Sequence, residues 1–285
     1  NAIHRLRHQH KVKLLCQVLN VNRSTYYKHF CNKPAPRTIQ NQQIRLNILQ
    51  IYSDFDKSIG AYKIQRVLER DYGIKISSGR VYRLMNTMNL PKMSSIKPKY
   101  KVSHNDESSY KNILNQKFNQ QSPNLVWASD FTYVKVNGKN CYLCVVIDLF
   151  SRKIVGWQVS PKHNSDLVIN AFKKAYMSRG YPQNILFHSD RGSEYTGRKF
   201  RQVTEKCNVL QSFSKKGYPY DNACCESFFK QMKREELNRR TFATLNEFRL
   251  SCFKYIERYN NKRPHASLNN LTPSELEENF FKHNL

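Results

Sequence analysis

Apolar residues recur at helical spacing in two stretches of the first third of the chain. In residues 60–70 the apolar positions share one helix face, and they do the same in a stretch that begins at Ser77 or Ser78. Gly73 lies between the two stretches and can supply the left-handed residue that ends the first helix. The pattern predicts two amphipathic helices joined by a short turn, as in a helix-turn-helix.

A shorter pair of the same kind comes earlier. Residues 11–19 show a short helical pattern, residues 20–22 read as a turn, and residues 23–30 follow as another short helix. Asn22 is suited to cap this helix, because its side chain can accept hydrogen bonds from backbone N–H groups of the first turn. We therefore expect two helix-turn-helix-like units before residue 93.

From residue 126 the period changes to that of strands. Residues 126–136 are rich in β-branched and aromatic side chains, and the Asn137-Gly138 pair that follows is a strong hairpin signal. Residues 142–147 form a second apolar run, and a turn at Ser151-Arg152 leads into a third run at 154–159. Three successive antiparallel strands are predicted.

A helix and a fourth strand come next. Residues 166–179 place apolar side chains at helical spacing, and residues 184–189 form a short buried strand. In this βββαβ order, a helical crossover can bring the fourth strand parallel to the first. The sequence therefore predicts a mixed sheet with the first and fourth strands side by side.

Charge indicates the partner. The 285 residues include 48 Lys and Arg against 21 Asp and Glu, and the net charge of +27 points to a polyanion. Residues 1–100 hold 19 basic and 4 acidic side chains, whereas residues 101–285 hold 29 and 17. Because phosphate contacts supply most non-specific affinity for DNA, we expect DNA binding by the first third.

Composition also excludes several classes of protein. A hydrophobic fraction of 39% argues against a disordered basic tail, and no long apolar run or signal peptide is present. We expect a cytoplasmic protein without a membrane partner. Eight irregularly spaced cysteines fit free thiols, and Cys141 and Cys144 do not suggest zinc, because they face opposite sides of a strand. The chain starts without Met, which leaves open whether a fused segment precedes it.

Three acidic residues are predicted to converge. Asp130 lies in the first strand, Asp190 ends the fourth, and Glu226 stands in the first two turns of a helix that begins near Asp221. Their oxygens can hold two hard divalent cations, which together activate a hydroxyl and stabilise the leaving oxygen in phosphodiester attack. Asp148 and Asp221 are interpreted as turn and helix-cap residues, with Asp221 as the N-cap of this helix.

Five ordered segments closely resemble transposases of the insertion sequence 3 family. They are residues 127–133 (WASDFTY), 142–157 (YLCVVIDLFSRKIVGW), 188–195 (HSDRGSEY), 220–226 and 259–265 (YNNKRPH). The two later acids have 35 residues between them, the spacing that names the DDE(35) class and the related retroviral integrases. The resemblance extends to the helical first third, although Gly-Ala-Tyr-Lys stands at 60–63 where Gly-Tyr-Arg-Arg is more usual.

The resemblance implies a mixed α+β fold. An N-terminal helix-turn-helix region would precede a ribonuclease-H-like, integrase-like catalytic domain with a mixed five-stranded sheet and a C-terminal helical extension. The expected divisions are a helix-turn-helix-like segment (1–35), a second helical DNA-binding domain (36–92), a basic linker (93–122), the catalytic core (123–240) and the helical extension (241–285).

The implied function is that of a DNA transposase. Such an enzyme binds the terminal inverted repeats of its element, cleaves at a 3′ end with water and uses the freed hydroxyl for strand transfer, first into a circular intermediate. The resemblance implies Asp130, Asp190 and Glu226 as ligands of two Mg²⁺ ions per site, with Mn²⁺ able to substitute. Its partners would be double-stranded element and target DNA in the nucleoid, further copies of the chain and an upstream first-reading-frame product.

Two other functions compete with this one. A catalytically silent DNA-binding protein or repressor could derive from a transposase, but the intact acidic triad argues against it. A ribonuclease-H-like nuclease acting on RNA hybrids is disfavoured by the two helix-turn-helix-like units. The intact triad and the helical first third therefore favour the transposase.

Candidate DNA contacts are basic or aromatic residues near the predicted site or on the predicted helices. Lys233 follows Glu226 by two helical turns, and residues 215–220 form a basic, aromatic loop. His188 shares a strand face with Asp190 and is either a DNA or metal-site contact or a packed structural histidine. The full set is Lys233, Lys230, Lys215, Lys216, Tyr218, His188, Asn222, Arg80, Arg83, Arg23, Tyr26, Lys28 and Arg263.

Overall fold

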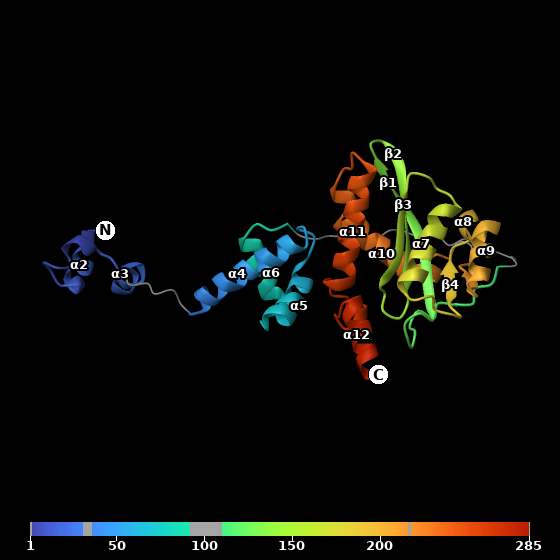
Figure 1. The fold of residues 1–285 in the computed structure, drawn as a ribbon. Helices are drawn as coiled ribbons and strands as arrows, with labels where there is room; N and C mark the ends of the chain where they lie inside the picture. Colours follow the sequence, from blue (N-terminus) through green and yellow to red (C-terminus); the bar gives the residue numbers. More distant parts are fainter. Residues whose placement is uncertain (1, 31–35, 92–109, 216–217, 285) are drawn as a thin grey trace.

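A computed structural model describes residues 2–30, 36–91, 110–215 and 218–284. Figure 1 shows two helical units at the N-terminal end and a sheet flanked by helices in the rest of the chain. None of the described helices combines the length and the apolar character that a membrane span requires.

The first unit consists of three short helices. They are α1 (Ala2–Leu6), α2 (Val12–Val18) and α3 (Arg23–Phe30), packed around Leu15, Cys16 and Tyr26. Asn22 Oδ1 accepts a hydrogen bond of 2.9 Å from the backbone N–H of Ser24, which confirms the predicted start of α3.

The second unit is built from α4 (Pro36–Asp54), α5 (Ala61–Tyr72) and α6 (Ser78–Thr87). Isoleucines of α4 and the predicted apolar faces of α5 and α6 form its core. Gly73 ends α5 with φ of 65°, and Ser77 accepts from the backbone N–H of Arg80 at the start of α6. The local signals for both helix ends are therefore confirmed.

The sheet has five strands in the order β3-β2-β1-β4-β5. Its first hairpin joins β1 (Val126–Val136) to β2 (Lys139–Asp148) through Asn137 and Gly138, which have φ of 45° and 75°. Positive φ at both positions is what a two-residue turn between twisted strands requires. β3 (Ile154–Ser160) completes the antiparallel part of the sheet.

Two parallel strands complete the sheet. β4 (Leu186–Ser189) pairs with β1 so that His188 is level with Ala128, and β5 (Leu210–Phe213) pairs with β4. α7 (Ser165–Ser178) is the crossover that the sequence predicts. The mixed five-stranded sheet is therefore confirmed, and it places the C-terminal end of β4 beside the first half of β1.

Helices cover both faces of the sheet (Figure 1). Alternate residues of β2 separate the two cores: Cys144 and Val146 pack on the side of α7, and Leu143 and Val145 pack on the other side. The first side also carries α8 (Ser193–Thr196) and α9 (Arg198–Lys206). The other side carries η1 (Pro219–Asn222), α10 (Ala223–Glu235), η2 (Leu237–Arg239) and α11 (Leu245–Asn261).

The C-terminal extension is fastened to the sheet domain. After η3 (Ala266–Leu268), α12 (Pro273–His283) starts at a capping box. Its buried Glu277 pairs with Arg179, next to α7, and with Lys153, whose Nζ lies 3.1 Å away. These ion pairs hold the last helix against the start of β3 and the end of α7.

Part of the segment interpreted as the linker packs on the sheet domain. The side chain of Leu114 is buried in the core, and the backbone N–H groups of Ile113 and Leu114 donate to Ser212 Oγ of β5. The linker prediction for 93–109 lies outside the described residues. The part from 110 onward belongs structurally to the sheet domain.

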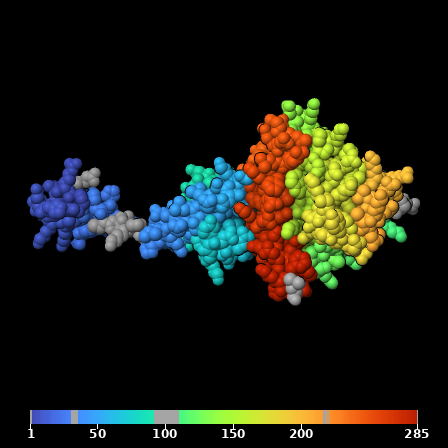
Figure 2. All heavy atoms as spheres, viewed as in Figure 1, coloured from blue at the N-terminus to red at the C-terminus, as the bar shows by residue number. Residues whose placement is uncertain are grey.

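The unit formed by α4 to α6 lies against the C-terminal helices (Figures 1 and 2). Its contacts there are polar: Lys63 Nζ lies 3.3 Å from Glu235 Oε1, Asp56 pairs with Arg258, and Arg70 donates to the carbonyl of Lys262. Short-range sequence patterns do not reveal this docking, because the partners are more than 170 residues apart.

Candidate active site

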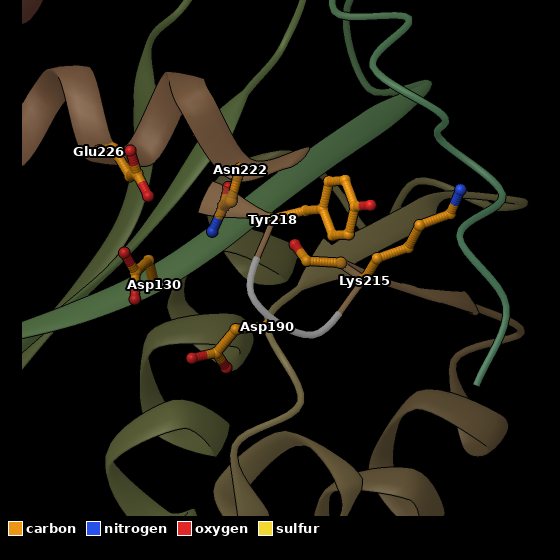
Figure 3. A pocket seen from close by; sticks show the side chains of 7 residues that line it. Asp130, Asp190, Lys215, Tyr218, Asn222 and Glu226 are labelled. Atoms are coloured by element: carbon orange, nitrogen blue, oxygen red, sulfur yellow. The ribbon is translucent and has the colours of Figure 1, made fainter. Parts of the chain in front are cut away.

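Three carboxylates from three elements line one pocket. Asp130 comes from β1, Asp190 follows β4 directly, and Glu226 stands in the first turn of α10. The pocket holds about 270 Å³, and Figure 3 shows the carboxylate of Glu226 turned toward Asp130. The predicted convergence follows from the parallel pairing of β1 with β4 and from the packing of α10 on the sheet.

The start of α10 is fixed by a buried aspartate that does not cap it. The carboxylate of Asp221 accepts hydrogen bonds from Asn112 and Gln116 at 2.8 Å and from the backbone N–H of Lys215 at 2.9 Å. The prediction of Asp221 as the N-cap is therefore wrong, because its side chain turns back to these segments. Asn222 occupies the cap position instead.

Asn222 links α10 to β1, the strand that carries Asp130. Its side-chain amide is buried and donates 3.1 Å to the carbonyl of Ser129, the neighbour of Asp130. Its Oδ1 has no hydrogen-bond partner among the residues that the structure describes. The residue lines the pocket, so its role as a predicted DNA contact stays a prediction.

The pocket disfavours negative charge in the absence of a cation. Burial, with the charge of Asp190 next in effect, raises the pKa of Asp130 to about 7, although Phe131 N–H donates to its Oδ1. Burial also raises the pKa of Asp190, despite a hydrogen bond from Gly192 N–H, and that of Glu226. Three carboxylates with raised pKa values in one pocket are typical of a functional site.

The donor set fits a hard divalent cation. All three groups offer carboxylate oxygens, the ligands that Mg²⁺ and Mn²⁺ prefer, and a bound cation would offset the cost of ionising them together. As the side chains stand, no three acidic, histidine or cysteine side chains of the described ranges are placed to ligate a single ion. The three acids therefore fit a divalent cation by the chemistry of their oxygens and by their convergence on one pocket.

Several predicted DNA contacts lie in the pocket wall or on α10, the helix that carries Glu226. Lys233 is half-buried and follows Glu226 by two turns of α10, and its charge lowers the pKa of Asp130. Lys230 is exposed, and exposed Lys215 holds its Nζ 6.0 Å from the centre of the Tyr218 ring. Lys216 lies outside the described residues. The DNA-binding roles of the other four remain predictions.

The structure places His188 inside the protein, away from any surface that DNA could reach. Its side chain is fully buried, with Nδ1 2.9 Å from Ser212 Oγ and Nε2 3.1 Å from Ser214 Oγ. Burial lowers its pKa to about 4, so the ring is neutral at ordinary pH. Of the interpretations left open by the sequence, the packed structural histidine is the one that fits.

Three further predicted contacts are engaged elsewhere. Tyr26 is buried in the core of the first unit, and neighbouring Tyr27 is the exposed aromatic residue of α3. Arg263 is buried and binds both carboxylate oxygens of Glu235 at 2.7 and 2.9 Å. Arg80 is half-buried and donates to two side chains of α4. Burial in one domain or in a contact between domains overrides the exposure that the local pattern suggests.

The remaining predicted contacts of the first third are exposed. They are Arg23, Lys28 and Arg83. Lys63, Arg234 and Glu235 form a further charged group, which the sequence reasoning missed. The sequence hints at this group only through Lys63, which lies in the 60–63 segment (Gly-Ala-Tyr-Lys) where the chain differs from the family's usual pattern. Its acidic partner, Glu235, lies 172 residues away.

Family models match most of the described sheet domain and the second helical unit. A model described as an integrase core domain matches residues 120–219, and another with the same description matches residues 208–273. A third, described as an HTH-like domain, matches residues 39–100. These matches confirm the predicted fold class of a helix-turn-helix region followed by an integrase-like core.

Two curated relatives are similar over nearly their whole length. The transposase for insertion sequence element IS904 of Lactococcus lactis is 36% identical over 252 residues, covering 86% of this chain and 98% of the relative. Transposase InsF for insertion sequence IS3A of Escherichia coli K12 is 33% identical over 273 residues, covering 93% of each.

Solved structures are more distant. The catalytic core domain of HTLV-2 integrase in complex with magnesium has a TM-score of 0.44 at 19% identity and covers 55% of this chain and 97% of that one. A simian T-cell lymphotropic virus intasome has a TM-score of 0.45 at 13% identity, covering 81% and 74%. Likenesses at this level carry no functional argument.

Proposed function

Because this chain belongs to the insertion sequence 3 family of transposases, we propose that it cuts and joins the DNA ends of its element at the pocket of Asp130, Asp190 and Glu226. In this proposal the enzyme binds the terminal inverted repeats, hydrolyses the phosphodiester at a 3′ end and uses the freed hydroxyl to attack a second one. The convergence of three carboxylates with raised pKa values in an integrase core carries the proposal.

The three acids would hold two divalent cations, with Mg²⁺ as the expected ion and Mn²⁺ as a substitute. The charges of both Asp190 and Glu226 raise the pKa of Asp130, which supports the three acids as one electrostatically coupled group. Their carboxylate oxygens together would hold the ions. When bound, such ions lower the pKa of the attacking water and neutralise charge at phosphorus.

The chain itself would align the DNA. Lys233 and Lys230 lie on the same helix as Glu226, and Lys215 and Tyr218 stand at the rim of the pocket. Alignment of the attacking hydroxyl with the phosphodiester contributes much of the rate in reactions of this kind. Exposed Arg23, Lys28 and Arg83 would bind the ends through the helical units, with several copies of the chain acting together on DNA.

Substitution of the acids tests the catalytic assignment. We expect Asp130→Asn, Asp190→Asn and Glu226→Gln each to lower Mg²⁺-dependent nicking of a duplex carrying the flanking inverted repeat by at least about a thousandfold, a size typical of essential catalytic groups. The affinity for the same duplex without divalent ions should not fall by more than about twofold. The acids carry the same sign of charge as DNA, so they do not contribute to its binding.

Glu278→Gln is the matched control, because Glu278 is an exposed acid on α12, away from the pocket. Its nicking rate should equal that of the wild type. Substantial nicking by Glu226→Gln would remove Glu226 from the site. A wild-type protein that binds the ends but nicks with neither Mg²⁺ nor Mn²⁺ would instead support a silent DNA-binding protein.

A further inference from the structure

A second cleft lies between the helix-turn-helix unit and the catalytic helix. We call it the interdomain cleft: Lys63 of α5 lines one side, Ser227, Lys230, Gln231 and Arg234 of α10 line the other, and residues 263–267 close it. It holds about 470 Å³ and is separate from the pocket of the three acids.

The cleft carries a surplus of positive charge. Four cations line it (Lys63, Lys230, Arg234 and Arg263), and no acidic residue does. Lys63, Arg234 and Arg263 pair with the buried carboxylate of Glu235, so the four cations of the cleft exceed this one negative charge by three.

The shared carboxylate does not satisfy these cations. Arg263 occupies both oxygens of Glu235 at 2.7 and 2.9 Å, and Lys63 and Arg234 reach only Oε1, at 3.3 and 3.4 Å. Burial and the charge of Arg263 lower the pKa of Lys63 to about 8 even though Glu235 raises it. An additional anion in the cleft would therefore be stabilising.

Polar groups in the cleft also lack partners. Arg234 Nε is buried without a hydrogen-bond partner among the described residues. Lys230 is exposed, and within the described part of the chain its ammonium group has no recorded hydrogen bond or ion pair. Because a buried donor without a partner is costly, these groups suit a ligand that offers several anionic oxygens.

The position of the cleft indicates which anion it takes. Lys230 and Arg234 follow Glu226 by one and two turns of α10, so Arg234 lies roughly 12 Å along the helix from the catalytic acid at 1.5 Å per residue. A DNA strand advances about 3.4 Å along the duplex axis per nucleotide, so this spacing corresponds to about three or four nucleotides.

We propose that the interdomain cleft binds one backbone phosphate of the element-end DNA, about three or four nucleotides from the phosphodiester that reacts, through Lys63, Lys230 and Arg234. The inference rests on the proposed function. A single phosphate then contacts both the helix-turn-helix unit and the helix that carries Glu226. Recognition of the DNA end by the helix-turn-helix unit is thereby coupled to alignment of that end beside Glu226.

Neutralising single phosphates tests the proposal. The full-length protein is titrated, with Ca²⁺ in place of Mg²⁺, against duplexes carrying the flanking inverted repeat with one methylphosphonate at successive positions. For the wild type, a methylphosphonate at one position near the cleaved bond should weaken binding about tenfold, the size of a lost charge-assisted hydrogen bond. In the double variant Lys230→Gln, Arg234→Gln, the same methylphosphonate should weaken binding by less than about twofold, because the side chains that bind this phosphate are already removed.

Lys282→Gln is the matched control, since it removes an exposed lysine near the end of α12 that does not line the cleft. It should keep the wild-type pattern. Lys230→Gln alone changes an exposed side chain, so it tests the same position if the double variant does not fold. The proposal would be overturned if the loss of affinity at each methylphosphonate position were the same in the wild type and in the cleft variants. It would also be overturned if Lys282→Gln gave the same result as the cleft variants.

Nicking of the unmodified duplex by the wild type with Mg²⁺ is measured in parallel. Nicking together with a scan that shows no cleft-dependent position overturns the phosphate site and leaves the proposed catalysis intact. A cleft-dependent position without any nicking supports the phosphate site and contradicts the catalytic assignment.

Discussion

Asp130 combines a demanding chemical environment with a central place in the pocket. Its pKa of about 7, against an ordinary 3.8, means that folding favours the protonated form of this residue when no cation is bound. Stability from this group is therefore complete below about pH 4 and is lost as the pH rises through about 7. Ionised Asp130 therefore destabilises the fold above about pH 7 unless a bound cation neutralises it.

Asp130→Asn should therefore stabilise the protein without divalent ions. With a chelator present, we expect its melting temperature to exceed that of the wild type. The difference should grow between about pH 4 and pH 7 and amount to a few degrees at higher pH. Saturating Mg²⁺ should narrow the gap, because only the wild type gains binding energy. Asp166→Asn changes an exposed acid and should show no such trend; a gap that does not vary with pH would contradict the raised pKa.

At the scale of elements, the first turn of α10 depends on a buried hydrogen-bond hub. Asp221 is 2% exposed and joins the segment at Asn112 and Gln116 to the backbone of Lys215, directly before the turn that leads to Glu226. The second half of the expected linker therefore takes part in placing Glu226, the third acid of the pocket. This is a role that its polar, aperiodic sequence does not indicate.

Asp221→Ala should destabilise the fold and misplace Glu226. Three donors lose their acceptor, and we expect a loss of about 2–4 kcal/mol in the free energy of unfolding, measured by urea denaturation. Asp221→Asn keeps one acceptor oxygen and should recover part of both stability and nicking. If Asp221→Ala unfolded at the same urea concentration as the wild type, the hub would not hold the start of α10.

At the scale of the whole molecule, the second helical unit is docked by polar contacts. Asp56 of that unit pairs with Arg258 of α11 and, at 3.8 Å, with Arg240. Tyr62 and Lys63 add hydrogen bonds to Asn270 and Glu235. Contacts of this kind are weakened by salt, unlike the apolar cores on either side of them.

Asp56→Lys should loosen the docking while leaving both units folded. We expect the radius of gyration from small-angle X-ray scattering to increase, and the increase to resemble that of the wild type in about 1 M salt, where exposed ion pairs are screened. The matched control is Asp54→Lys, which makes the same charge change at the end of α4, where the exposed Asp54 accepts a hydrogen bond from Gln50 of its own helix. An equal increase in both variants would show that net charge, not the Asp56 contact, is responsible.

Much of the fold and all three pocket acids could be predicted from the sequence. Helix and strand positions follow from periods of a few residues, and Gly73 and the Asn137-Gly138 pair mark turns by their own backbone preferences. The three acids were found because each sits in a motif next to a predictable element, and the crossover rule brings β1 and β4 together.

The tertiary structure alone decided which polar residues face solvent. Local spacing does not distinguish Tyr26 from Tyr27, nor does it show that His188 and Arg263 are covered. It also gives no sign that Lys63 meets Glu235, 172 residues away. Burial depends on segments that are distant in the chain and meet only in the folded protein, whereas sequence periodicity reports interactions over a few residues.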